Sequence, residues 1–123
     1  MAITRFEDIQ AWQMARHLCR KTYRICHDGK FRRDFALRDQ SQRAAVSVMA
    51  NIAEGFDSRS NSEFIQFLYY ALRSVSELQS HFYIAKDQDY ISDAQFSEMC
   101  EEASNTKKMI FGFIEYLRTH DKP

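Results

Sequence analysis

The apolar positions between Leu37 and Gly55 fall on two faces of a predicted helix. At about 100° per residue, the first face contains Leu37, Ala44, Ala45, Val48 and Ile52, and the second contains Val46, Met49, Ala50 and Ala53. The polar strip that separates them contains Gln40, Arg43, Ser47, Asn51 and Glu54. A helix in a lone bundle is covered mainly from one side, so this pattern predicts that a further partner covers the second face.

Three other segments also have apolar residues at helical spacing, and local signals mark where the helices begin and end. The predicted helices cover about residues 6–26, 34–54, 61–87 and 93–119. Gly29 interrupts the pattern after the first helix, and Gly55 suits the left-handed position that ends many helices. Ser60 and Ser92 are each followed three residues later by Glu or Gln, which is the capping-box pattern of a helix start.

Few residues in the chain would break these helices, because it contains three glycines and one terminal proline. Short connections force sequential helices to run antiparallel. The sequence therefore predicts an all-α fold, an antiparallel up-down-up-down four-helix bundle, in one domain over residues 1–123. A chain of this length can bury its own core without disulfides or metal.

Basic and acidic residues are equal in number over the whole chain, but they are distributed unevenly between its two halves. The formal net charge is zero. Residues 1–60 carry eleven basic and seven acidic residues, a net charge of +4, whereas residues 61–123 carry six and ten, a net charge of −4. Such halves can complement each other between subunits, or they can give an oligomer one basic and one acidic rim.

Cysteine usage and hydropathy indicate a cytoplasmic location. Cys19, Cys26 and Cys100 are odd in number and lack the C-x-x-C spacing of zinc or redox sites, so we expect reduced thiols. No stretch has the apolar run of a signal peptide or the roughly 20 apolar residues of a membrane span. We expect no membrane association, no metal and no cofactor, and we identify no small-molecule substrate.

A cluster of basic residues is the candidate site for nucleic acid. Phosphate recognition needs spaced cations, and a ring of subunits would multiply such a cluster. Arg16, Arg20 and Arg24 recur every four residues and so share one side of the first helix, and a basic connection follows. The candidate residues are Arg16, Arg20, Arg24, Lys30, Arg32 and Arg33. A solvated face, or one that meets the acidic half of a neighbouring subunit, explains the same pattern.

The polar strip of the second helix resembles the parts of an acid–base site, but no nucleophile–base pair accompanies it. We expect instead a buried hydrogen-bond network that fixes helix register and subunit docking, because polar groups between two apolar faces need partners. The residues assigned to this network and to assembly are Gln40, Arg43, Ser47, Asn51, Glu54, Gly55 and Glu77. We assign no catalytic residue and expect no enzymatic activity.

Two further patterns on the third helix have ordinary explanations. Glu77 and His81 are one residue too far apart for the Glu-x-x-His element of a di-metal bundle, and no second copy exists. Ile65, Tyr69 and Tyr83 form a patch that could stack on bases, although a subunit interface is the preferred interpretation.

Several motifs in the chain resemble one known family. They are Phe6-Glu7-Asp8-Ile9 with Ala11-Trp12-Gln13, then Leu37-x-x-Gln40-x-x-Arg43-Ala44-Ala45-Val46-Ser47-Val48, Asn51-Ile52-Ala53-Glu54-Gly55, and Phe64, Phe67, Ala71, Ser74 and Glu77-Leu78. These motifs are similar to those of the four-helix-bundle intervening-sequence proteins, encoded in insertions within bacterial ribosomal RNA genes. The accessory variability determinants of diversity-generating retroelements are related to that family. Arg73 stands where the family commonly has glycine.

The resemblance implies a bacterial four-helix bundle that assembles as a ring-shaped homopentamer, with no established activity for most members. The retroelement relatives bind nucleic acid and a reverse transcriptase through positively charged ring surfaces. Two functions therefore remain open. The chain binds nucleic acid, or a nucleic-acid enzyme, through its basic surface, or it is a structural adaptor that docks a protein partner without nucleic acid.

Overall fold

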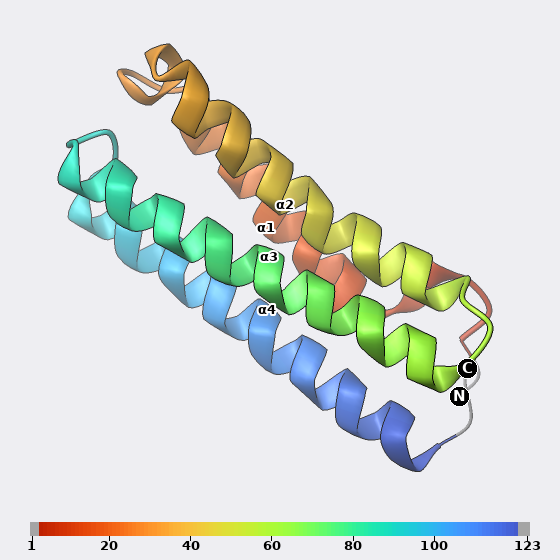
Figure 1. Cartoon of the computed structure of the whole chain (residues 1–123). Coiled ribbons are helices and arrows are strands. Elements are labelled where there is room, and N and C mark those ends of the chain that lie inside the picture. The colour runs from red at the N-terminus through yellow and green to blue at the C-terminus, as the bar shows by residue number, and fades with distance from the viewer. Residues whose placement is uncertain (1–2, 121–123) are drawn as a thin grey trace.

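Four long helices form the fold in a computed structural model that describes residues 3–120 (Figure 1). The elements in chain order are the 3-10 helix η1 (Phe6–Asp8), α1 (Gln10–Cys26), the 3-10 helix η2 (Phe31–Arg33), α2 (Phe35–Phe56), α3 (Asn61–Asp87) and α4 (Asp93–Thr119). Within those residues there is no strand, and α1 contacts α2 and α4 while α3 contacts the same two helices. The predicted all-α four-helix bundle is confirmed.

The first two helices differ from the prediction at their ends. The segment predicted to be helical from residue 6 forms η1 first, and Ile9, with extended backbone angles, separates it from α1. The second helix extends two residues beyond its approximate predicted end, since α2 continues to Phe56. The left-handed conformation expected at Gly55 is wrong, because Gly55 is helical. In the described chain, positive φ angles occur at Gly29, where the first helix was expected to break, and at Asp89.

Side-chain caps mark the starts of α3 and α4. The Ser60 hydroxyl accepts a hydrogen bond from the backbone N–H of Glu63 at 3.2 Å, although the Glu63 carboxylate accepts from Arg59 instead of closing the box. Ser92 and Gln95 form the complete reciprocal box. These caps fix the starts of α3 and α4 where the sequence predicts them.

One carboxylate joins the two loops at the same end of the bundle. Asp34 caps α2 by accepting from the backbone N–H of Leu37 at 3.1 Å, and it also accepts from the Tyr90 hydroxyl at 2.9 Å. The hydrogen bond to Asp34 raises the pKa of Tyr90. Because Phe31 packs against the Tyr90 ring at a centroid distance of 5.6 Å, η2 is held against the α3–α4 connection.

The core follows the predicted apolar stripes. All five residues of the first face of α2 are buried. On α3, Phe64, Leu68, Val75, Leu78 and Phe82 have no exposed surface, and α4 contributes the buried residues Met99, Ala103, Ile110, Ile114 and Leu117. No helix within residues 3–120 has an apolar stretch long enough to cross a membrane.

The second apolar face of α2 is not covered within one subunit. Val46 has 44% of its surface exposed, Ala50 is exposed, and Met49 and Ala53 are half-buried. This face therefore remains available to another chain.

Gly55 is required by a close approach between α2 and α3 rather than by a helix end. A Cβ atom at this position would lie 2.7 Å from Cδ1 of Phe64 and 2.9 Å from Cβ of Phe67. Non-bonded carbon atoms essentially never approach a Cβ atom this closely, and the Phe64 ring is fully buried in a close-packed interior, where displacing it is costly. A hydrogen atom at Gly55 therefore sets the distance between the two helices.

We expect Gly55→Ala to lower the free energy of unfolding by on the order of 1–3 kcal/mol, because overpacking outweighs the gain in helix propensity. Gly112→Ala in α4 is the matched control, since its Cβ would meet no atom within 4 Å. The control should be more stable than the wild type by ~0.5–1 kcal/mol. Urea unfolding followed by circular dichroism, at equal protein concentrations, measures both changes. Equal effects of the two substitutions would contradict this account of Gly55.

Candidate nucleic-acid interface

The six predicted basic residues lie on one side and one end of the bundle, and all are exposed. Their spacing places three of them on the outer side of α1, and the others follow in the turn and in η2. We call the set Arg16, Arg20, Arg24, Lys30, Arg32 and Arg33 the basic surface. None of the six forms an ion pair with any residue between positions 3 and 120.

Two carboxylates of α4 pair with the edge of α1 that faces them and not with the basic surface. Lys21 lies on the edge of α1 that faces α4, and its Nζ is 2.7 Å from Oε1 of Glu98 and 3.0 Å from Oε1 of Glu102. These hydrogen bonds raise the pKa of Lys21, and the bond to Lys21 lowers the pKa of Glu98. His17 on the same edge is 3.6 Å from Glu102. The carboxylates of α4 therefore neutralise one edge of α1 and leave its outer arginines free.

One member of the basic surface stacks on an aromatic ring. The Arg16 guanidinium lies 5.9 Å from the centre of the Trp12 ring, and Trp12 packs edge-on against Phe6 at 5.2 Å. A stacked guanidinium keeps its charge and its donors while its carbon stem covers apolar surface.

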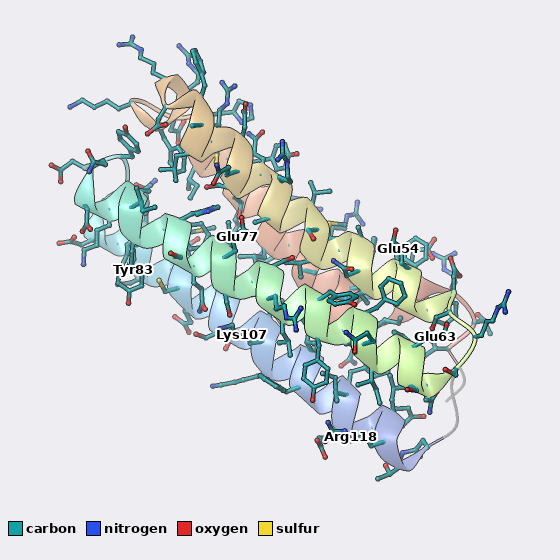
Figure 2. The ribbon with its side chains drawn as sticks, viewed as in Figure 1. Glu54, Glu63, Glu77, Tyr83, Lys107 and Arg118 are labelled. Carbon is teal, nitrogen blue, oxygen red and sulfur yellow. The ribbon has the colours of Figure 1, made fainter. Side chains whose placement is uncertain are left out.

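The polar strip of α2 is partly a hydrogen-bonded seam and partly solvent-exposed in one subunit. Asn51 donates to the backbone oxygen of Ser47 at 2.8 Å and to its hydroxyl at 3.0 Å, and the Ser74 hydroxyl donates to Ser47 at 2.9 Å. This part joins α2 to α3. The remaining predicted members are exposed and lie on α2 and α3: Gln40, Arg43, Glu54 and Glu77. Glu54 and Glu77 are labelled in Figure 2. That a second subunit completes this network remains a prediction.

The sequence analysis missed a buried contact between α2 and α3. Ser41, which is fully buried, has its hydroxyl 3.3 Å from Nδ1 of His81, and Nε2 of His81 is 3.7 Å from Oε2 of Glu77. The order resembles a nucleophile, a base and an acid, but a substrate could reach Ser41 only if the helices separated. The available signal was the position of Ser41 on the apolar face, four residues after Leu37.

Neither a metal site nor an activated thiol is found among residues 3–120. Glu77 and His81 form a pair without a third ligand, and no three His, Cys, Asp or Glu side chains between residues 3 and 120 are grouped as a metal site requires. The three cysteines are free, and burial raises the pKa of each thiol, that of Cys26 to about 12. A thiol with a raised pKa is a poor nucleophile at neutral pH.

The match to a family model decides the relationship of this chain to other proteins. The model describes the 23S rRNA-intervening sequence protein, and it matches residues 7–112. The chain belongs to this family. The matched range contains the whole basic surface, the polar strip and the Ser41–His81 contact.

A solved structure supports the fold of this intervening-sequence family member. It is a crystal structure of a protein of unknown function from the S23 ribosomal protein family of Bacteroides thetaiotaomicron. The two chains are 20% identical with a TM-score of 0.76, and the match covers 85% of this chain and 97% of the other. No curated protein sequence is detectably similar to the chain. At this identity the likeness establishes the shared fold.

We expect His81 to make stability depend on pH. Burial lowers the pKa of His81 below its ordinary value of 6.5, and the Glu77 carboxylate opposes this shift. The unfolded chain therefore binds a proton more readily than the folded one. The stabilisation is complete above about pH 6.5 and is lost as the pH falls towards the folded pKa.

The test compares urea unfolding of the wild type and His81→Gln between pH 8 and pH 5. Glutamine keeps a polar partner for Ser41 but does not titrate, so the variant should lose less stability over this interval than the wild type. Identical losses in the two proteins would show that His81 does not control this dependence.

Proposed function

We propose that this intervening-sequence family member is a non-enzymatic, oligomeric protein that binds nucleic acid through the basic surface. The observation that carries the proposal is that six exposed cations on one side and end of the bundle have no carboxylate partner within the described chain. Free, spaced cations are what a phosphate backbone needs, since each contact releases condensed counterions. A single chain of zero net charge would bind weakly, and several copies would add their contacts.

The oligomer that we propose is a ring-shaped homopentamer, as the resemblance described above implies. It is supported by the uncovered face of α2, where Val46 and Ala50 are exposed beside the polar strip. A neighbouring subunit on this face would bury the apolar residues and provide partners for Arg43, Glu54 and Glu77. A cytoplasmic location is part of this proposal.

A structural adaptor is the second candidate. The favouring observation is the amount of large apolar side chain exposed on a single subunit, including Tyr83 at 58% and Phe111 at 50%. Salt separates the two functions, because nucleic-acid binding weakens steeply as salt rises whereas an apolar protein contact is retained.

We expect Val46→Glu to reduce the molar mass measured by light scattering after gel filtration, because a charge would be buried in the subunit interface. Ile84→Glu on α3 is the matched control, since Val46 and Ile84 are both 44% exposed in one subunit. Both variants should keep the helical circular dichroism of the wild type. A wild-type monomer, or equal masses of all three proteins, would contradict the proposed assembly.

We expect the triple substitution of Arg16, Arg20 and Arg24 by Ala to weaken RNA binding by at least about tenfold, measured by fluorescence anisotropy. The slope of log affinity against log salt should become shallower by about 0.7–0.9 per lost phosphate contact. The charge-matched control replaces Arg73, Lys107 and Lys108 by Ala on α3 and α4, and it should bind as the wild type does. Unchanged affinity and slope in the first variant, with its molar mass intact, would refute the role of the basic surface.

A further inference from the structure

A groove runs along the outer seam between α3 and α4, away from the basic surface. Two depressions of about 480 and 920 Å³ adjoin there, and they share Gln66 and Tyr69 in their linings. We call the combined feature the α3–α4 groove. On α3 it extends from Asn61 to Ser76, and on α4 and its C-cap from Lys107 to His120.

The length and shape of the groove suit a helix. The stretch from Asn61 to Ser76 rises by about 22 Å at 1.5 Å per residue, which is the length of a helix of about 15 residues. Two antiparallel helices form a trough that can receive a third, as in recognition of amphipathic helices by helical grooves. The groove is open to solvent along this length, so its shape suits an elongated partner better than a small molecule.

The groove also has apolar anchors. Ile65, Tyr69 and Leu72 follow one another at spacings of four and three on α3, and Phe111 faces them from α4 with half of its surface exposed. Tyr69 is fixed in place because its hydroxyl accepts a hydrogen bond from Nη2 of Arg118 at 2.8 Å. A partner could therefore bury apolar side chains against a preformed floor.

The charges around the groove are all of one sign. Residues 61–123 contain ten acidic and six basic residues, yet the charged residues that line the groove are Arg73, Lys107 and Arg118, with no Asp or Glu among them. Figure 2 labels Lys107 and Arg118 on α4. Arg118 already contacts Glu115 at 3.1 Å. Arg73 and Lys107, one on each wall, form no ion pair with any residue from 3 to 120. Two cations without a carboxylate partner therefore flank the apolar part of the groove floor, which includes Leu72 and Phe111.

We propose that the α3–α4 groove docks an acidic amphipathic helix of a partner protein. The apolar face of the helix packs on Ile65, Tyr69, Leu72 and Phe111, and carboxylates on its two edges bind Arg73 and Lys107. Nucleic acid fits the groove less well. The two unpaired cations of the groove are few for a polyphosphate backbone, whereas the apolar part of the groove floor matches an apolar helix face. This inference is independent of the function proposed for the basic surface.

The test uses a designed, blocked peptide of about 16 residues with Leu and Phe at positions i, i+3, i+4 and i+7 and Glu on the flanking positions. A second peptide has Lys in place of every Glu, and a third has the acidic composition in scrambled order. Binding of the labelled peptides to the full chain is measured by fluorescence anisotropy at low and moderate salt. The protein variants are Arg73→Glu with Lys107→Glu and, as matched control, Lys86→Glu with Lys108→Glu, which lie outside the groove lining.

The proposal expects the acidic amphipathic peptide to bind the wild type and the control variant equally, and to bind the groove variant at least about tenfold more weakly. The Lys peptide should recover affinity for the groove variant, which shows that this variant is folded and that charge decides the preference. The proposal is overturned if the acidic peptide does not bind the wild type, or binds no more tightly than the scrambled one. It is also overturned if an RNA oligonucleotide displaces it competitively.

The oligomeric state provides the remaining control. The groove variant should keep the molar mass of the wild type. A fall in mass confined to this variant would mean that the groove is covered by a second copy of the chain, and would overturn the proposal.

Discussion

The close approach of α2 and α3 at Gly55 is the constraint on which the rest of the subunit depends. With only a hydrogen atom at Gly55, the backbone of α2 comes against Phe64 and Phe67. Once the helices meet there, their antiparallel register brings Ser47 to Ser74 and Ser41 to His81 further along the seam. These polar contacts are short-ranged and directional, so they are made only when the helices are at this distance and in this register. Buried Val48, Ile52, Leu68 and Val75 can then pack without voids.

The contact between α2 and α3 also shows which features of the fold could be predicted from the sequence and which could not. The buried face of α2, the stripes of α3 and α4 and the caps at Ser60 and Ser92 could be predicted, because each follows from residues near one another in the chain. Gly55 was misassigned as a helix end, because a glycine required by a neighbouring helix and one required by a left-handed turn are identical in sequence. The Ser41–His81 pair was missed for a related reason. Its members are 40 residues apart, and only the packed register of α2 and α3 brings them together.

The candidate site could be predicted only in part, for the same reason. The sequence shows which charges share one face of a helix, but it does not show which of them are paired with residues on other helices. The spacing of four residues places Arg16, Arg20 and Arg24 on one side of α1, but it does not show which basic residues nearby are paired. In the fold, Lys21 is bound by Glu98 and Glu102, and Arg38 by Asp39 at 3.0 Å. Charge counted along the sequence therefore overstates what the segment can offer to a partner. The six residues of the basic surface have no carboxylate partner within residues 3–120, and they support the proposed function better than the total charge does.

A chain of zero net charge can present two cationic surfaces because several of its carboxylates are engaged elsewhere. Glu98 and Glu102 face α1 and pair with Lys21, whereas Asp34 accepts a hydrogen bond from Tyr90 in the loop contact.

The basic surface and the α3–α4 groove differ in the side chains that surround their cations. The three arginines of α1 project outward from a polar helix side, so binding there depends on charge and weakens with salt. Arg73 and Lys107 border Leu72 and Phe111, so a partner there gains from apolar burial and uses the charges mainly to select its sign and orientation. If a ring forms through the uncovered face of α2, each subunit would repeat both surfaces. Nucleic acid and a protein partner could then bind the same assembly without competing for one site.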